Sequence, residues 1–359
     1  MACGLAVFAG SLSAAAPLTS ACEAKPFAPG PDPFWPAAIS AVARTRLGVP
    51  PDGAKAIDEF VALCRDSGAD TCLIVWHDHI VAEWFSADYH GESLNIASST
   101  KSITGLLACV LQAEGKVGYK DPVGKYLPSW KDGGWRGRVA IDDLLTMTSG
   151  ITHEFDMDDE FMDNMLLDFN RYVVKRMEPS EVPGLYFNYA NYAAQLLSPI
   201  LDKVAGEPLH RFARKKLFDP LSIAPDSGYL TDPAGGTVDF MGAHFRPREF
   251  ARIGALVLHG GTWEGRQIVP ASTCADVAVG NPEGNPNYGR LWWVLKNPNG
   301  LEMLGSGHND CYIYPAADLV VVRQQARQRP VRREYESFVA PTLASLVAAL
   351  SDPPKEIRK

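Results

Sequence analysis

The sequence has no surplus of basic residues. Its 34 lysines and arginines are outnumbered by 42 aspartates and glutamates, and the formal net charge is −8. A nucleic-acid-binding surface needs a patch of positive charge, and an anionic membrane surface attracts the same pattern. We therefore expect neither nucleic acid nor an anionic membrane surface as a partner.

Long apolar runs and internal repeats are also lacking. Beyond the first two dozen residues, no run reaches the roughly 18 apolar residues that a membrane-spanning helix needs. No repeat with a period of about 20–50 residues is present, which argues against a solenoid. The 359 residues are 46% hydrophobic, enough to bury one large core or two coupled ones.

The first residues differ from the rest of the chain. Residues 1–21 carry no charge and are mostly small or apolar, like a secretory signal. The usual positively charged start is missing, so an apolar N-terminus without this role is the alternative. Residues 18–22 resemble a loose lipoprotein signal, with Cys22 as a candidate lipidation site. We expect residues 1–24 to be a leader, export to the periplasm or cell envelope, and membrane contact only through a lipid on Cys22.

The seven cysteines are not spaced as zinc ligands. Cys109 lies in an apolar helical run and is expected to be a small buried hydrophobe. Cys64 and Cys72 flank a polar turn, and an exported protein could join them in a disulfide bond. His77 and His79 could suggest a metal pair, but no third ligand is near, so a solvated hairpin turn is the simpler interpretation.

The predicted strands lie towards both ends of the chain, with helices between them. Short β-branched and aromatic runs predict strands at Thr71–Trp76, Ile80–Phe85, Tyr288–Leu295, Glu302–Gly305, Cys311–Tyr314 and Leu319–Arg323. Apolar residues at helical spacing predict helices at Ala54–Arg65, Ile141–Thr148, Tyr192–Val204, Arg248–His259 and Tyr335–Leu350. We expect an α/β fold in the sense of an α+β sandwich. One antiparallel sheet, built from N- and C-terminal segments, is flanked by helices and carries a mostly helical insertion, with a cleft between the two parts.

This pattern also divides the chain into segments. Residues 25–51 are rich in proline and are expected to form an extended arm. Residues 52–350 are expected to form a single domain. Within it, residues 52–120 and 247–350 make the α/β part, and residues 121–246 make the mostly helical part.

Ser98 and Lys101 are the most informative pair of residues. Three residues are nearly one helical turn, so both side chains project from one helix face. A serine hydroxyl is a poor nucleophile at neutral pH unless a base assists it, and a lysine amine at this spacing could be that base. The apolar residues that follow predict a buried central helix that ends near Gly115. The alternative is an ordinary helix start with both side chains in solvent.

A second group of polar and aromatic residues occupies residues 187–192. Tyr189 and Asn191 are two residues apart, so in an extended turn they point the same way. A phenol can relay a proton, and an amide can hold a substrate carbonyl. The alternative is that Tyr189 packs in the core and Asn191 caps the following helix.

The third group is the run from Gly305 to Asp310, just before a predicted strand. Glycines at 305 and 307 let a ligand approach the backbone closely. His308 could be a general base, but a wall of the site or a structural role is weighed above it. Asp310 follows too closely in sequence for us to assume that it orients His308.

In this order, the three groups resemble the serine β-lactamase-related family, and most closely its class C branch. That branch includes D-alanyl-D-alanine peptidases, serine esterases and aminohexanoate-oligomer hydrolases. Other similar segments are Ile141–Gly150, Phe187–Leu221, Gly261–Pro270 and Tyr288–Trp293, so the likeness extends from about Asp58 to Val322.

The resemblance implies a hydrolase that forms an acyl-serine intermediate, with no metal or organic cofactor. It implies that Ser98 is the nucleophile, Lys101 its base, and Tyr189 the proton relay to the leaving group. Asn191 would contact the substrate carbonyl or Lys101. The oxyanion would be bound by the N–H of Ser98 and by one N–H from the strand after Gly307, in the region His308–Cys311. Gly307, His308 and Asn309 are also expected to bind substrate.

One departure from the family pattern bears on the substrate. The family's strand motif usually starts with a basic residue, and here the best match, residues 305–307, is Gly-Ser-Gly. We therefore expect an esterase or amidase acting on a small molecule or short peptide. The alternatives are a β-lactamase or D-alanyl-D-alanine peptidase, and a non-catalytic cell-envelope binding module with the same fold.

Overall fold

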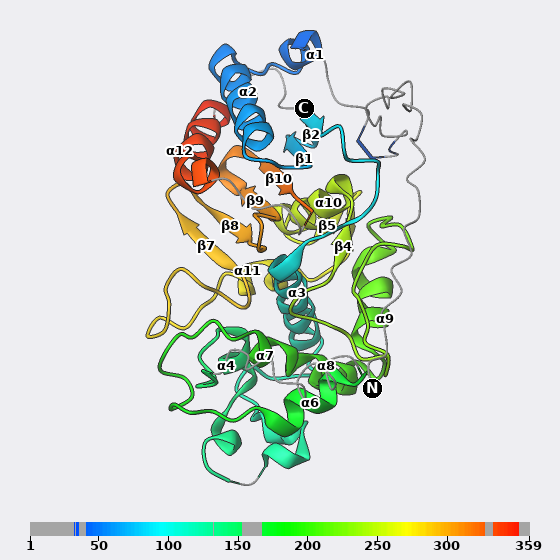
Figure 1. Ribbon diagram of the computed structural model, residues 1–359, viewed down its shortest axis with the longest axis vertical. Coiled ribbons are helices and arrows are strands. Elements are labelled where there is room, and N and C mark those ends of the chain that lie inside the picture. Colours follow the sequence, from blue (N-terminus) through cyan, green and yellow to red (C-terminus); the bar gives the residue numbers. More distant parts are fainter. Residues whose placement is uncertain are drawn as a thin grey trace, which may run out of the picture.

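The structure of the protein is a computed structural model that describes residues 32, 34–35, 41–131, 133–152, 167–326 and 333–351. The molecule has two halves that meet around a central helix (Figure 1). One half is a six-stranded sheet with covering helices, and the other consists of short helices and long loops. The predicted α/β fold, with one antiparallel sheet from both ends of the chain and a mostly helical insertion, is confirmed.

The main sheet joins segments that are far apart in the sequence. Its strands are β1 (Thr71–Trp76), β2 (His79–Phe85), β7 (Trp293–Lys296), β8 (Asn299–Met303), β9 (Asp310–Tyr314) and β10 (Leu319–Gln324). Their spatial order is β2-β1-β10-β9-β8-β7, and all neighbours are antiparallel. Strand β1 pairs with β10 along its whole length, so this part of the sheet joins strands that are more than 200 residues apart in the sequence.

Side chains of β1 alternate between two hydrophobic cores. Leu73 and Val75 belong to the core on one face of the sheet, and Cys72, Ile74 and Trp76 belong to the core on the other. Every residue of this strand is buried, because both faces of the sheet are covered.

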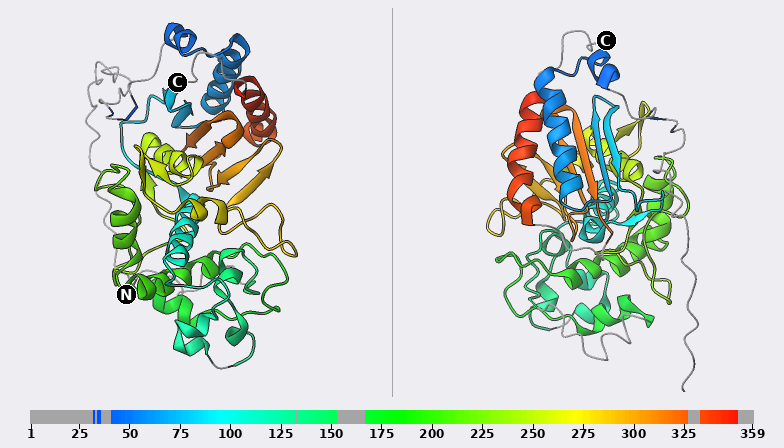
Figure 2. Two further views of the ribbon diagram at one scale, coloured as in Figure 1. Left: turned by 180° about the vertical axis from the view of Figure 1, so that it is seen from behind. Right: turned by 45° about the horizontal axis from the view of Figure 1, so that its top comes forward.

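Three long helices cover the sheet. Helices α2 (Pro51–Asp66) and α12 (Arg333–Leu350) lie side by side on one face, and α10 (Pro247–Leu258) lies on the other (Figure 2). No helix among the described residues combines the length and the apolar character required to cross a bilayer.

The central helix α3 (Thr100–Ala113) runs from the sheet into the helical half (Figure 1). Its residues 100–111 are all buried, as expected for a helix that is surrounded by other elements. The helix ends where predicted, because Gly115 takes a left-handed conformation with φ 72° and its N–H bonds to the Gln112 carbonyl.

The remaining elements are short. The other helices are α1 (Ala41–Arg46), α4 (Ile141–Leu145), α6 (Phe169–Arg176), α7 (Asn191–Gln195), α8 (Leu197–Ala205), α9 (Leu209–Ala213), the π-helical turn Arg214–Phe218 and α11 (Ala271–Asp276). Two-residue strands pair as β3 (Leu94–Asn95) with β4 (His244–Phe245), and as β5 (Thr262–Trp263) with β6 (Arg266–Gln267). Single 3₁₀ turns occupy Ala97–Ser99, Val123–Lys125, Pro128–Trp130, Arg136–Arg138 and Pro315–Ala317.

Two predicted elements differ from the structure. The strand predicted at Tyr288–Leu295 begins only at Trp293, because Leu291 has φ 62° and its N–H bonds to the Leu145 carbonyl in the helical half. The helix predicted at Tyr192–Val204 is broken into α7 and α8. Pro199 has no N–H to bond the carbonyl four residues earlier, so a continuous helix is interrupted there.

The suggested disulfide bond is wrong. Cys64 and Cys72 are both free thiols, and both are fully buried in the core between α2 and the sheet, where they act as small apolar side chains. Cys109 is buried in α3, as predicted. His77 lies in the hairpin turn and its Nδ1 is 2.7 Å from Asp318 Oδ2. No cluster of three metal-ligating side chains occurs among the described residues.

The N-terminal predictions fall largely outside the described residues. The leader and Cys22 lie there, so export and lipidation stay predictions. The segment expected to be an extended arm contains the short helix α1, which is a difference from the prediction. Trp35, from the same segment, is 2% exposed and packs edge-on against Trp263, so this part of the segment is fastened to the body of the protein.

Candidate active site

Ser98 and Lys101 contact each other at the start of the central helix. Lys101 Nζ lies 2.9 Å from Ser98 Oγ, which is hydrogen-bonding distance. Lys101 is 1% exposed and also donates to the Phe240 carbonyl at 2.9 Å. An amine held at this distance can take the serine proton as the hydroxyl attacks a carbonyl.

The residue before Ser98, Ala97, is held in an uncommon backbone conformation by its neighbours. Ala97 has φ 48°, a left-handed value that a non-glycine residue adopts only when its surroundings enforce it. The Ala97 N–H is bound by Asn95 Oδ1 at 2.7 Å, and Thr100 Oγ1 donates to the Ala97 carbonyl at 2.6 Å. Ser98 is thereby presented on a single 3₁₀ turn just before α3.

The neighbouring hydroxyls in this segment have structural partners. Ser99 Oγ donates to the Asn309 carbonyl at 2.6 Å, and Ser102 Oγ donates to the Leu291 carbonyl at 2.8 Å. Both residues are buried, whereas Ser98 lines a cavity. Of these three serines, only Ser98 combines a nearby amine with access to a ligand.

Tyr189 lies beside the Ser98–Lys101 pair. Lys101 Nζ is 4.8 Å from the centroid of the Tyr189 ring, a distance at which the ring face attracts a cation. The Tyr189 ring also stacks on Trp293, with the two ring centroids 6.2 Å apart. The structure therefore brings together the three residues predicted to be catalytic.

The turn from Gly305 to Asp310 is fixed against the segment that carries Ser98. A Cβ atom at residue 305 would lie 2.2 Å from the Ile96 carbonyl oxygen, so only glycine permits this approach. On the other side of the turn, the Ser99 hydroxyl holds the Asn309 carbonyl. These two contacts place the predicted turn next to Ser98.

Buried Arg323 sets the orientation of the turn's peptide groups. Its Nη1 donates to the carbonyls of Gly307 and His308, at 2.8 and 2.9 Å. In a trans peptide the C=O and the following N–H point in opposite directions. Because the Gly307 carbonyl faces Arg323, the His308 N–H points away from Arg323, and both residues line the cavity.

Two backbone N–H groups are therefore available at the site. Neither the Ser98 N–H nor the His308 N–H has a hydrogen-bond acceptor among the described residues. A pair of N–H groups without protein acceptors, one on the nucleophile and one on a facing strand turn, can bind the oxyanion of a tetrahedral intermediate.

His308 has a partner that sequence reasoning did not assume. Its Nδ1 lies 3.1 Å from Asp310 Oδ2, and Asp310 is fully buried. The backbone of His308 has φ 55°. This left-handed conformation turns the chain so that the side chains of His308 and Asp310 meet. No sequence signal gave this contact, since residues two apart in a strand would only share a face.

The cavity in front of Ser98 has a volume of about 380 Å³. Its lining residues are Ser98, Tyr189, Trp293, Leu304, Gly305, Ser306, Gly307, His308 and Glu336. Trp293 and Glu336 were not predicted, because they come from β7 and α12 and reach the site only through the tertiary fold.

Two of the predicted substrate-binding residues do not line this cavity. Asn309 is fully buried, with Nδ2 donating to the Ser306 carbonyl and Oδ1 accepting from the Gln325 N–H, so its side chain shapes the turn and does not face a ligand. Its N–H also bonds the Gly305 carbonyl. Asn191 begins α7 and is half-buried, and its role in substrate binding stays a prediction.

Glu302 lies behind the turn, on β8. Burial, and then the charge of Asp310, raise the pKa of Glu302 to about 8, while a hydrogen bond with Tyr312 opposes this shift. Glu302 is therefore protonated at neutral pH, which spares the region a second buried charge beside Asp310.

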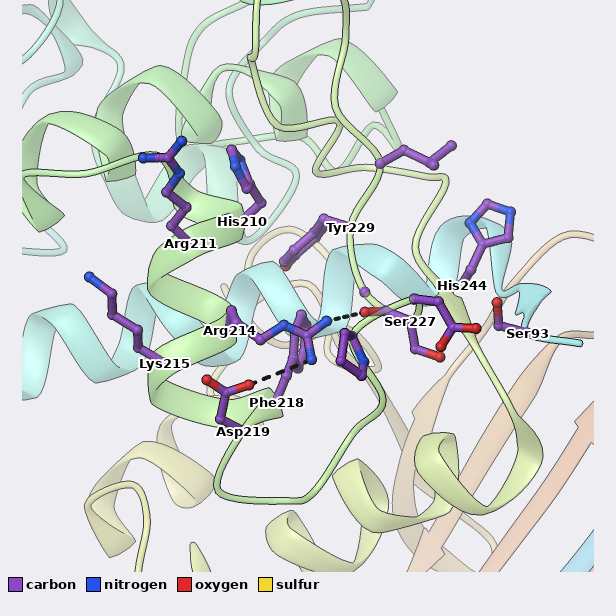
Figure 3. A pocket seen from close by; sticks show the side chains of 14 residues that line it. Ser93, His210, Arg211, Arg214, Lys215, Phe218, Asp219, Ser227, Tyr229 and His244 are labelled. Carbon is purple, nitrogen blue, oxygen red and sulfur yellow. Dashed lines mark hydrogen bonds and ion pairs between the residues drawn. The ribbon is translucent and has the colours of Figure 1, made fainter. Parts of the chain in front are cut away.

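A larger cavity of about 690 Å³ shares no lining residue with the Ser98 cavity (Figure 3). It contains side chains of the same kinds, among them Ser93, Lys215, Tyr229 and His244. Figure 3 shows Lys215 and Ser93 on opposite sides of this cavity, so they do not form a nucleophile and base.

The charged groups of the larger cavity bind protein groups instead. Arg214 donates to the carbonyls of Ile223, Ala224 and Ser227. Lys215 pairs with Glu207 at 2.7 Å, and the Tyr229 hydroxyl lies 2.9 Å from Thr104 Oγ1. Size alone therefore does not mark the reactive site of this molecule.

Comparisons with known proteins agree with this geometry. A profile of the β-lactamase family matches residues 90–239, which include Ser98, Lys101 and Tyr189. A 6-aminohexanoate-dimer hydrolase from Paenarthrobacter ureafaciens is 22% identical over 315 residues, covering 80% of this chain and 80% of that protein.

Solved structures share the fold. A 6-aminohexanoate-dimer hydrolase-like protein from Bacillus anthracis superposes with a TM-score of 0.70 at 22% identity, covering 82% of this chain and 83% of its own. A family VIII carboxylesterase superposes with a TM-score of 0.61 at 17% identity, covering 84% of this chain and 97% of its own. The chain is therefore similar to the β-lactamase family over residues 90–239, and it has the fold of these proteins around a Ser-x-x-Lys pair at the start of its central helix.

Proposed function

We propose that this protein hydrolyses an ester or amide of a small molecule or short peptide through an acyl intermediate on Ser98. The observation that carries the proposal is the 2.9 Å contact between Ser98 Oγ and the buried Lys101 amine, at the wall of a cavity. The names of the relatives support it, since one is a hydrolase of an amide dimer and another a carboxylesterase.

The proposed reaction begins with proton transfer from Ser98 to Lys101 as Oγ attacks the substrate carbonyl. The N–H groups of Ser98 and His308 then bind the oxyanion, and each such donor contributes about 3–4 kcal/mol to lowering the barrier. Tyr189, next to Lys101, passes a proton to the leaving group. Water then releases the acyl group and restores Ser98.

The charges at the cavity favour some substrates over others. Among the described residues that line it there is no lysine or arginine, and Glu336 contributes a carboxylate. β-Lactams and D-alanyl-D-alanine peptides carry a carboxylate, which this lining does not attract. We therefore place neutral or amine-bearing esters and amides ahead of β-lactams.

An activity screen tests this proposal. Purified protein is assayed with p-nitrophenyl esters, D-amino-acid amides, linear amide oligomers and a chromogenic cephalosporin, with the Ser98→Ala variant as control. Turnover of esters or amides that depends on Ser98 supports the proposal. Fast turnover of the cephalosporin indicates the β-lactamase alternative, and ligand binding without labelling by a fluorophosphonate probe indicates a binding module.

A further inference from the structure

We propose that His308, oriented by Asp310, is the general base that activates water for hydrolysis of the acyl-enzyme. This inference rests on the proposed acyl-serine function, because it assigns a residue to the second half of that reaction. Lys101 then serves the first half and His308 the second.

The contacts of Asp310 fix the protonation of the imidazole. Asp310 Oδ1 accepts the Gly305 N–H at 3.2 Å, and Oδ2 accepts the Tyr312 hydroxyl at 2.9 Å. Both carboxylate oxygens of Asp310 act as acceptors in these contacts. The contact between Oδ2 and His308 Nδ1 is therefore a hydrogen bond only if Nδ1 is the donor, so Nδ1 carries the proton. The remaining nitrogen, Nε2, then holds a lone pair and can accept a proton.

The imidazole is held by a ring contact and by an ion-pair partner but is open on the side of the cavity. The ring packs on Tyr335 with centroids 4.6 Å apart, and the Nδ1 edge is held by Asp310. Its side chain keeps 21% exposure and lines the same cavity as Ser98. The Glu336 carboxylate lies 4.0 Å from Nε2, so a positive charge that forms on the ring is stabilised from the open side too.

The position of Lys101 argues for a separate base in the second step. Lys101 is buried behind Ser98, is bonded to the Phe240 carbonyl, and is not among the residues that line the cavity. A water molecule that enters after the leaving group departs arrives through the cavity, whose titratable side chains are Tyr189, His308 and Glu336. Tyr189 already serves the leaving group beside Lys101, and His308 is the one whose Nδ1 is held by a buried carboxylate.

Deacylation moves one proton from water to His308 and then from His308 to Ser98. The water oxygen bonds to the acyl carbon while one of its protons passes to His308 Nε2, and the oxyanion is bound by the two N–H groups. The bond between the acyl carbon and Ser98 Oγ then breaks, and the imidazolium returns the proton to Oγ. The products are the free acid and unmodified enzyme, and His308 ends as it began.

The test separates acylation from deacylation. Asparagine tolerates the positive φ of residue 308 and keeps the backbone N–H, so His308→Asn removes only the imidazole. Stopped-flow assays with a p-nitrophenyl ester turned over by the wild type give the burst rate for acylation and the steady-state rate for deacylation. We expect a burst within threefold of wild type, a steady-state rate lowered about 10²–10⁴-fold, and an acyl adduct seen by intact-protein mass spectrometry.

Further variants exclude a merely structural role. In His308→Gly, added imidazole should restore deacylation but leave the burst rate unchanged, which a structural residue would not allow. In Asp310→Asn, an amide NH₂ faces either His308 Nδ1 or the Gly305 N–H, so the imidazole loses the required orientation and the pH profile of deacylation should change. His244→Asn, in the larger cavity, is the matched control and should leave both rates unchanged.

The outcomes distinguish this inference from the function on which it rests. Normal steady-state turnover in His308→Asn, or no imidazole rescue in His308→Gly, overturns the role of His308 while Ser98 chemistry stands. Absence of any burst or acyl adduct in the wild type and in every variant, with turnover intact, overturns the acyl-serine mechanism itself.

Discussion

Two cavities of this molecule, one of about 690 Å³ and one of about 380 Å³, contain the same kinds of side chain in different arrangements. The larger one has Ser93, Lys215, Tyr229 and His244, and the smaller one has Ser98, Tyr189 and His308 in front of Lys101. In the larger cavity, the lysine is bound to Glu207 and the tyrosine contacts Thr104.

The difference lies in which groups are left for a ligand. In the smaller cavity a serine touches an amine, and two backbone N–H groups have no protein acceptor among the described residues. Those features, and not the residue types or the volume, distinguish a reactive site from a structural hollow. A change in one cavity can therefore be judged against a matched change in the other, or elsewhere in the molecule.

The largest effect is expected from the two serines. Ser98→Ala removes the proposed nucleophile, so kcat for ester hydrolysis should fall about 10⁴-fold or more, and fluorophosphonate labelling should disappear. Ser93→Ala should leave both unchanged. Hydrolysis that survives in the first variant, or is lost in the second, would reverse the assignment of the two cavities.

The two lysines give the next contrast. Lys101→Met keeps a long apolar side chain but removes the amine 2.9 Å from Ser98 Oγ, so the acylation rate should fall about 10²–10⁴-fold. Lys215→Met, at the exposed side chain paired with Glu207, should change kcat less than twofold. Measured burst rates for both variants decide the matter; equal losses would show that the Ser98–Lys101 contact is not used.

A backbone change tests the proposed oxyanion site. Gly305→Ala places a Cβ atom 2.2 Å from the Ile96 oxygen, so the turn must move and the His308 N–H must shift with it. We expect kcat to fall about 10²–10³-fold. Gly115→Ala, which meets nothing within 4 Å but strains a φ of 72°, should lower the melting temperature without lowering kcat. A Gly305→Ala enzyme with normal kcat would rule out this turn as part of the site.

In the larger cavity, the expected effect is on stability. Arg214→Met leaves the carbonyls of Ile223, Ala224 and Ser227 without their donor, which should reduce the free energy of unfolding by about 1–3 kcal/mol. Urea unfolding measures this loss, and kcat at a temperature well below the transition should stay at the wild-type value. A specific loss of kcat would mean that the two cavities are functionally coupled.

The smallest effect is a pH dependence of stability near the site. Because the pKa of Glu302 is raised to about 8 in the folded protein, folding favours its protonated form. This contribution to stability is fully present below about pH 4.5 and is lost as the pH rises through about 8. Glu302→Gln should therefore have nearly the same free energy of unfolding as the wild type at pH 5 and a higher one at pH 9. Urea unfolding at both pH values measures it, with Glu336→Gln, at an exposed position, as the control.

The parts of the site that are local in sequence were predictable. A three-residue spacing on a helix places Ser98 and Lys101 together whatever the rest of the chain does, and the apolar stripe after them predicts a buried helix. The strands β1, β9 and β10 were predicted to within one residue, because runs of β-branched and aromatic residues mark them.

The parts of the site that depend on tertiary contacts were not predictable from the sequence. Arg323 orients the turn from a neighbouring strand, and the His308–Asp310 contact depends on a positive φ that no side-chain pattern signals. Asn309 was taken for a ligand contact because it is polar and near glycines, yet both ends of its amide are bound to the backbone. A polar residue beside a site can equally be the one that builds it.

The pairing of β1 with β10 has a consequence for the protein's synthesis. Ser98 and Lys101, the proposed nucleophile and base, are made early, but the turn that faces them follows more than 200 residues later and is fixed by Arg323 on β10. A chain still emerging from the ribosome would carry Ser98 and Lys101 with no facing N–H and no closed sheet. The proposed hydrolytic activity should therefore appear only after β10 has been made, and chains released before that point should be inert.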